Sequence, residues 1–387
     1  MKKTLTLVAA FIMAAAMANA ETSEVNSEVN EKSVAYADLN TDAAILEAHQ
    51  PLMAAPQADA EKDAKYWAQA VGSRIKVTGY AQGGYTATFN DGADNTNTFD
   101  LKRIILMVGA NISKDFYAFF MHEFKSGNVM EYYMEYRPSK AINFRLGQSK
   151  IELSMENPMS PTVLESVTPM SQSVGYLCGG YKNNGSGRDN GIMMYGNLFD
   201  DKLKYVVEVL NGGVINKADD NNQKDIVAKL EYKLLPNLRV SASGMKGYSS
   251  TNSLGEKCER YKANRYAVGA EWKSSPAGTD YNRNRCAMVR AEVLGGEDGE
   301  VGSFGAYCSA AIPVYKQLDV VAMVDYFNKN TDFGAKQTNL MAGVQYWIHK
   351  KCRLQAQYLH AIKNDAMKVY SGSDSYGQFL SQVQVAF

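Results

Sequence analysis

Charged side chains recur at every second position in several short segments of the sequence. Glu131, Glu135 and Arg137 share one parity, with tyrosine and methionine between them, and Arg290 and Glu292 show the same spacing. Side chains two residues apart on a strand point to the same face. Acidic and basic groups on one wall create a local field that selects among charged solutes. This pattern indicates binding or passage of ions rather than catalysis.

Ten residues of this kind are our candidates for lining a pore or its constriction. They are Arg103, Glu131, Glu135, Arg137, Arg145, Lys150, Glu156, Glu165, Arg290 and Glu292. Glu156 and Glu165 lie in segment 151–188, which is far longer than an ordinary link between strands. We expect this segment to fold into the lumen as a constriction loop, with its carboxylates facing Arg145 and Lys150. The alternative is an external loop that covers the mouth.

Catalytic and metal chemistry are not expected. The four histidines include His122 and His360, which fall in strand-like segments without a serine and an acid in evident register. No two histidines have the spacing of metal ligands. Glycine pairs such as Gly83-Gly84 are not followed by a helix, so they do not predict a phosphate-binding loop. We therefore predict no enzyme activity, no cofactor and no metal site.

The elements that carry these residues are predicted to be strands. From Arg74 to the last residue, apolar and polar residues alternate with period two, as in 203–209, 226–234 and 340–348. Each run has about ten residues, the length of a tilted strand that crosses a membrane. The mean hydropathy of −0.31 agrees, since lipid-facing and lumen-facing residues cancel. We predict an all-β fold, a transmembrane antiparallel β-barrel.

The lengths of the connections fix the predicted strand number. Short turns, as at 200–201 and 235–237, alternate with long links, and bacterial barrels have short periplasmic turns and long external loops. A simple count gives seventeen strands if Ser173 to Tyr181 is one of them. Bacterial single-chain barrels have an even number. We therefore assign that stretch to the long loop after the fifth strand and predict sixteen strands. The predicted long links are 211–224, 249–262, 328–337 and 364–375.

The two ends of the sequence indicate export. Residues 1–20 have a basic start, an apolar stretch and a small-residue cleavage site, which predicts a signal peptide. Residues 21–72 are acidic and polar and predict a periplasmic leader, flexible or partly helical. Residues 73–387 form the predicted outer-membrane barrel. Phe387 ends an alternating strand and resembles the signal that the barrel-assembly machinery recognises.

Charge and cysteine content add weaker constraints. The formal net charge is zero, but the acidic leader leaves a modest basic excess in the barrel region, which favours anions weakly. The five cysteines cannot all pair within one chain. Unpaired small fillers are one interpretation, and a single bridge from Cys178 to Cys258 is the other.

One motif carries a resemblance to a known family. The segment Arg145-Leu146-Gly147-Gln148-Ser149-Lys150, followed by 153–157, resembles the strand and loop entry of the phosphate-selective porin O and P family. The similarity extends over roughly residues 74–387, and Lys150 and Glu156 match motif positions. Ser149 stands where the family usually has an aromatic residue. The resemblance implies a trimeric outer-membrane channel for small anions.

The predicted function is therefore passive diffusion of small hydrophilic solutes through a porin in the bacterial cell outer membrane, with a preference for anions such as phosphate. Expected partners are outer-membrane lipid, the barrel-assembly machinery, two further copies in a homotrimer and small anionic solutes, but no nucleic acid. One alternative is a channel specific for another solute such as an oligosaccharide. Another is a non-conducting structural or adhesion barrel.

Overall fold

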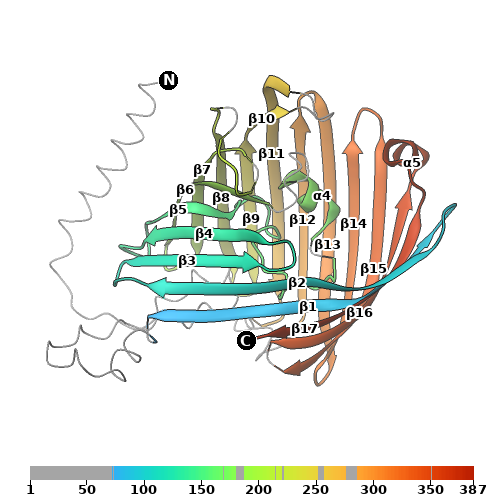
Figure 1. Ribbon diagram of the computed structural model, residues 1–387, viewed down its shortest axis with the longest axis horizontal. Coiled ribbons are helices and arrows are strands. Elements are labelled where there is room, and N and C mark those ends of the chain that lie inside the picture. The colour runs from blue at the N-terminus through green and yellow to red at the C-terminus, as the bar shows by residue number, and fades with distance from the viewer. Residues whose placement is uncertain are drawn as a thin grey trace. The chain divides into compact units, whose positions relative to one another are not determined.

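The computed structural model describes residues 72, 74–168, 170–179, 187–213, 215–219, 222–251, 257–275, 286–349 and 351–387. The predicted signal peptide and nearly all of the predicted leader lie outside these ranges. The described residues form one closed antiparallel sheet (Figure 1). Its first half consists of β1 (Ile75–Asn90), β2 (Thr96–Asn111), β3 (Phe116–Glu123), β4 (Asn128–Tyr136), β5 (Asn143–Lys150), β6 (Arg188–Leu198), β7 (Leu203–Leu210) and β8 (Asp225–Leu235).

The second half continues the same sheet. It consists of β9 (Leu238–Lys246), β10 (Tyr248–Thr251), β11 (Lys257–Lys273), β12 (Met288–Asp298), β13 (Val301–Tyr315), β14 (Leu318–Asn330), β15 (Ala335–His349), β16 (Cys352–Lys363) and β17 (Tyr376–Ala386). β9 and β10 are separated by Gly247 alone, and both pair with β11. They are therefore two parts of one strand, and the prediction of a sixteen-stranded antiparallel barrel is confirmed.

The barrel closes between its first and last strands. β1 pairs with β2 on one edge and with β17 on the other, with Tyr80 opposite Ala386 in the register. Phe387 extends this ladder, since its N–H donates to the Gly79 carbonyl at 3.0 Å and its carbonyl accepts from the Gly79 N–H at 3.2 Å. With β9 and β10 counted as one strand, each described strand pairs with a neighbour on both sides, which closes the sheet.

Two helices lie in the links of the described chain. α4 (Gln172–Leu177) lies within the connection between β5 and β6, which confirms that the described part of the stretch from Ser173, up to residue 179, is not a wall strand. α5 (Asp365–Ser371) lies in the predicted long link 364–375. No helix in the described part of the chain is long and apolar enough to cross a membrane.

Two of the predicted long links are shorter than expected. β10 and β11 extend into 249–262, and β14 and β15 reach to Asn330 and Ala335 within 328–337. In both cases the strands continue in antiparallel pairing through polar residues. The backbone ladder needs no apolar side chains, so polarity alone marks the end of a strand poorly.

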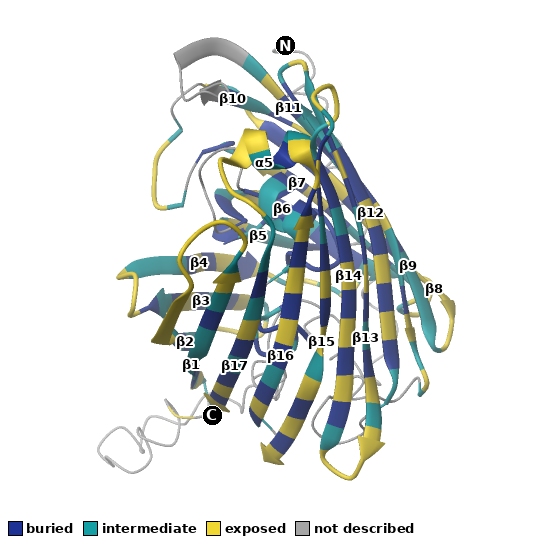
Figure 2. Ribbon diagram, turned by 90° about the vertical axis from the view of Figure 1, so that its right-hand side faces the viewer, coloured by how far each residue is buried: buried dark blue, intermediate teal, exposed yellow. Residues whose placement is uncertain are grey.

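Alternate residues along each strand face opposite sides of the wall, visible as stripes in Figure 2. On β8, Ile226 and Leu230 are exposed on the outside while Lys229 and Glu231 are buried on the inside. The same alternation places an apolar band on the outer surface. Its members include Leu146, Ile192, Val209, Leu234, Val268, Val324, Val344, Leu354, Ile362, Val383 and Val385. Such a band suits contact with lipid.

Gly147 in β5 is required by the close approach of β4. Its φ is +138°, and a Cβ at this position would lie 2.2 Å from the Tyr132 carbonyl oxygen. We expect Gly147→Ala to lower the free energy of unfolding by about 1–3 kcal/mol through backbone strain. The loss is measured by heating samples to a series of temperatures before a denaturing gel. The folded band of the variant should disappear at a lower temperature. Gly213→Ala, where the nearest atom is 3.7 Å away, is the control and should be neutral. Equal stability of both variants would contradict this explanation.

Candidate functional site

The connection between β5 and β6, residues 151–187, is named here the β5–β6 loop. Its described residues lie against inward-facing side chains of the barrel wall. It contacts β7 and β8 through Glu152, β9 and β12 through Ser154, and β14 through Gln172. Between Ser154 and Gln172 in the chain, the carbonyl oxygens of Pro161 and Thr162 accept hydrogen bonds from side chains on β1 and β17. The loop thus follows the inner wall from β7 round to β1.

The β5–β6 loop leaves the neighbourhood of Glu156 and returns to it at Ser171. The Ser171 N–H donates to Glu156 Oε2 at 2.8 Å. Asn157 Nδ2 donates to the carbonyls of Ile151 and Gly187 at 2.7 and 3.1 Å, which closes the base of the loop. The described residues in between, 158–168 and 170, therefore form a side excursion that leaves and returns to nearly the same place.

An apolar interface also fixes the β5–β6 loop. Leu153, Val167, Val174 and Leu177 are buried against one cluster on the inward faces of the strands. The wall residues of that cluster are Leu210, Val227, Met245, Ala267, Leu294, Tyr307, Met323, Met341, Leu359, Ala361 and Leu380. Burial of this apolar surface favours the docked loop.

Buried ion pairs tie the loop carboxylates to the wall. Lys229 Nζ lies 3.0 Å from Glu152 Oε2 and 3.0 Å from Glu231 Oε1. Arg290 lies 2.6 Å from Glu165, 3.2 Å from Glu271 and 3.7 Å from Glu156. Loss of one partner from such a buried group is strongly destabilising.

The Arg290 pairs continue a row of charges across three strands. Glu271 on β11 stands opposite Arg239 on β9 and opposite Arg290 on β12 in the strand register. Arg239 Nε lies 3.1 Å from Glu271 Oε1. Glu165 of the loop therefore adds a fourth charge to an alternating row. Alternation along β9 and β11 already places Arg239 and Glu271 inward, so sequence reasoning could have included them.

The prediction that the loop carboxylates face Arg145 was wrong, since Arg145 is paired with Glu135 of the neighbouring strand. Glu152, Glu156 and Glu165 pair with or approach basic groups on β8 and β12 instead. Lys150 donates to the Met159 carbonyl of the loop. The cause is the path of the loop, which crosses to the distant strands at its first residues.

A second group of candidates, Glu135, Arg137 and Arg145, lies on β4 and β5 and just after the end of β4. Arg145 Nε lies 2.7 Å from Glu135 Oε1, and Arg137 Nε donates to Glu135 Oε2 at 2.5 Å. The Arg145 guanidinium lies 4.0 Å from the centre of the Tyr133 ring, and that of Arg137 lies 4.0 Å from the Tyr117 ring. An arginine stacked on an aromatic ring stays charged while the flat face of its guanidinium group packs against the ring.

The remaining candidates occupy separate positions. Glu131 pairs with Arg188 at 2.8 Å. Glu292 accepts from Ser154 Oγ at 2.5 Å and from the Met155 N–H at 2.9 Å, so it holds the loop. Arg103 on β2 donates to Gln82 Oε1 at 2.9 Å, and Gln82 in turn donates to the Pro161 carbonyl. Arg103 thus lies where the far end of the loop meets the wall. A pore-lining role for the ten residues stays a prediction.

Burial raises the pKa of both acidic groups near the start of the loop, but the neighbouring cations give the two carboxyls opposite net shifts. Burial opposes ionisation of Glu152, but Lys204 and Lys229 more than offset it and hold the pKa of this carboxyl below its usual range. Burial raises the pKa of Glu156 to about 7, with Arg290 offsetting part of the effect. Glu156 therefore changes charge near neutral pH.

This difference predicts a pH dependence of stability. Because the folded pKa of Glu156 lies above the unfolded value of 4.5, the folded state binds the proton more tightly, so this group costs stability as pH rises from about 4.5 to 7. We expect Glu156→Gln to gain up to about 3 kcal/mol relative to the unchanged protein between pH 4 and pH 8. Urea midpoints in detergent micelles at both pH values measure this.

The exposed Glu300→Gln is the matched control for this charge change and should show no such trend. A Glu156→Gln stability difference that stays constant with pH would contradict the assignment.

The structure also decides the cysteine question in part. Cys178 is a free, buried thiol whose Sγ lies 3.6 Å from the Leu153 carbonyl oxygen, so the Cys178 to Cys258 bridge was a wrong prediction. Within the described ranges, no cluster of three or more His, Cys, Asp or Glu side chains has metal-binding geometry.

The fold is similar to that of solved outer-membrane porins. Similar solved structures include an anion-selective porin from Comamonas acidovorans, with a TM-score of 0.61 and 14% identity, covering 81% of this chain and 99% of that one. Salmonella typhi OmpF in complex with daunomycin has a TM-score of 0.59 and 13% identity, covering 81% and 97%.

The outer-membrane channel DcaP of Acinetobacter baumannii has a TM-score of 0.58 and 12% identity, again covering 81% and 97%. Neither a family model nor a curated protein matches the sequence. The porin fold and the apolar outer band together place the protein in the bacterial outer membrane.

Proposed function

We propose that this protein is a porin, a water-filled channel through which small hydrophilic solutes diffuse across the outer membrane. The observation that carries the proposal is the closed sixteen-stranded barrel, with an apolar outside and charged side chains on the inside. A barrel of this size has room for an aqueous lumen. The similar structures named as an anion-selective porin and an outer-membrane channel support the same function.

We propose that solutes pass between the β5–β6 loop and the inner wall formed by β2 to β6. Apart from the hydrogen bond from Lys150 on β5 to the Met159 carbonyl, the loop's hydrogen bonds to the wall given above follow it from β7 to β1, which leaves most of β2 to β6 opposite the loop. That stretch of wall carries Arg103, Arg137 and Arg145. The loop would narrow the lumen by filling the other side.

The proposed preference is for anions such as phosphate. On β2 to β6 the arginines outnumber the carboxylates Glu131 and Glu135 among our ten candidates, whereas the loop carboxylates are neutralised by the opposite wall. Planar guanidinium groups are suited to oxyanions. The motif that resembles the phosphate-selective porin O and P family ends at Lys150, near the entry to the loop.

Assembly follows the same resemblance. We infer a homotrimer in outer-membrane lipid, inserted by the barrel-assembly machinery that reads the strand ending at Phe387. The absence of enzyme activity also stays a prediction.

Liposome swelling separates a channel from a structural barrel. Liposomes containing the protein should swell in isotonic solutions of small sugars, at rates that fall steeply as the solute grows. Swelling equal to that of empty liposomes would indicate a structural or adhesion barrel. Selective uptake of one oligosaccharide over smaller sugars would indicate the solute-specific alternative.

Charge reversal at Arg103 tests the proposed path. Among the described residues Arg103 has no ion pair, and its side chain is half-buried beside the loop. We expect Arg103→Glu to lower the ratio of chloride to potassium permeability roughly threefold or more, because the charged side chains that line a channel set its local field. Lys336→Glu makes the same charge change on an exposed position of β15 and should leave the ratio unchanged. Equal effects of both variants would contradict the path.

A further inference from the structure

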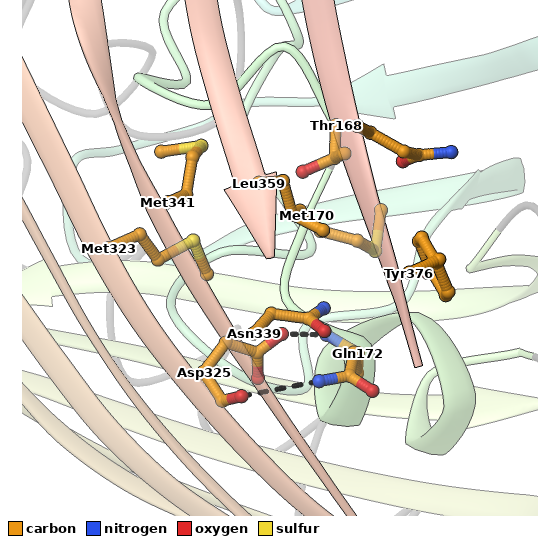
Figure 3. Close-up of a pocket in the computed structure, with 10 residues that line it drawn as sticks. Thr168, Met170, Gln172, Met323, Asp325, Asn339, Met341, Leu359 and Tyr376 are labelled. Atoms are coloured by element: carbon orange, nitrogen blue, oxygen red, sulfur yellow. Dashed lines mark hydrogen bonds between the residues drawn. The ribbon is translucent and has the colours of Figure 1, made fainter. Parts of the chain in front are cut away.

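A small pocket lies between the β5–β6 loop and the inward faces of β14 to β17 (Figure 3). Its volume is about 180 Å³. Its lining residues are Thr168, Met170, Gln172, Met323, Asp325, Asn339, Met341, Leu359, Tyr376 and Gln378. One buried water needs only about 10–15 Å³ of such space, so the pocket has room for a small organic group.

Most of the lining is apolar and polarisable. Met323 and Met341 are buried on adjacent strands, and Leu359 completes this side. Met170 and Tyr376 pack on the same cluster from the loop and from β17. Thioether and aromatic walls adapt to short hydrocarbon chains. One side of the pocket is therefore suited to a short hydrocarbon chain.

The polar end of the pocket contains a buried carboxylate with one oxygen unsatisfied. Asp325 is 3% exposed. Its Oδ2 accepts from the Gln172 N–H at 2.8 Å, as Figure 3 shows, but its Oδ1 has no hydrogen-bond partner. No Lys or Arg forms an ion pair with Asp325 among the residues described. A buried carboxylate without a cation costs several kcal/mol.

Anchoring of the loop explains only half of this carboxylate. Oδ2 receives the first N–H of α4, and Gln172 Nε2 donates to the Asp325 carbonyl at 3.2 Å. A neutral asparagine would satisfy the same contact to the backbone. The second oxygen, buried beside an apolar cavity, needs a donor that the described protein does not supply.

We propose that this pocket binds a small organic cation, a primary ammonium group that carries a short apolar chain. The ammonium donates to Asp325 Oδ1, and the chain lies along Met323, Met341 and Leu359. The site is distinct from the proposed anion path, because it lies on the side of the lumen that the loop covers. It would bind such amines whether or not the barrel conducts ions.

The donor set argues against a metal ion. Hard cations such as Ca²⁺ take six to eight oxygen ligands, and Asp325 is the one carboxylate in the lining. Soft metals favour thioether sulfur, and Met341 Sδ already accepts from Ser166 Oγ at 3.3 Å. An organic cation uses both the carboxylate and the apolar wall.

Saturation-transfer NMR with n-butylammonium on the full-length protein in detergent micelles tests the site. We expect saturable binding that Asp325→Asn weakens roughly tenfold or more, since a charged hydrogen bond is lost. n-Butanol, which has the chain without the charge, should bind as weakly as n-butylammonium binds the variant. Asp319→Asn removes an inward carboxylate from the same strand outside the pocket and should leave binding unchanged.

A second variant guards against misfolding of the first. Leu359→Phe fills the cavity but keeps the carboxylate, and it should also weaken binding. Equal binding to the unchanged protein and to Asp325→Asn, or no binding at all, would overturn the proposal. Binding of Ag⁺ without binding of n-butylammonium would overturn it too and would assign a thioether metal site. None of these outcomes depends on conductance, so the porin proposal is tested separately.

Discussion

Replacement of residues 158–170 by a Gly-Ser-Gly linker is expected to raise the single-channel conductance roughly twofold or more, since a channel's narrowest section controls its flow. This excursion carries the loop to β16, β17 and β1, where Arg353 donates to the Leu164 carbonyl at 2.8 Å. Ser171 and Glu156 are hydrogen bonded, so a short linker can join the two ends without moving α4. Planar bilayers at fixed salt measure the change.

A matched change elsewhere separates widening from general damage. Shortening the link that holds α5, residues 364–375, removes a segment of similar length outside the barrel wall. We expect its conductance to equal that of the unchanged protein. If the shortened β5–β6 loop also left conductance unchanged, the loop would not form the constriction.

Arg290→Met is expected to lower the free energy of unfolding by about 3–5 kcal/mol, because the buried carboxylates around Arg290 lose this cation. Arg290 is fully buried and lies within 4 Å of Glu165, Glu271 and Glu156. Glu271 keeps Arg239, so the loop carboxylates lose most. The docked loop should loosen, and the open-channel current should become noisier. Urea midpoints and current recordings measure the two effects.

A second substitution tests the cause. Adding Glu165→Gln to Arg290→Met removes one uncompensated charge and should recover part of the lost stability. Lys336→Met removes an exposed cation and serves as the neutral control. If Arg290→Met were as stable as the unchanged protein, the ion pairs would not fix the loop.

The strands could be predicted because the alternation is a local property. The predicted alternation over 340–348 is confirmed by the exposed Leu340 and the buried Met341 and Gln345. Parity of the strand count removed the stretch that begins at Ser173 from the wall, and α4 confirms this for its described residues. Strand ends were less certain, since β10 and β11 continue through polar residues.

The partners within the site could not be predicted in the same way. Glu165 and Arg290 are 125 residues apart, and their contact depends on the path of the β5–β6 loop. No local pattern specifies that path, because it depends on packing of Leu153, Val174 and Leu177 against distant strands. The pairing of Arg145 with Glu135 was accessible, since the two residues face each other across neighbouring strands in register.

The reversal potential of the reconstituted protein in a potassium chloride gradient tests the central claim most directly. If the barrel is an anion-preferring porin, the potential will have the sign of chloride permeation, and added phosphate will reduce the chloride current. A potential with the sign of potassium permeation, with no effect of phosphate, would contradict it.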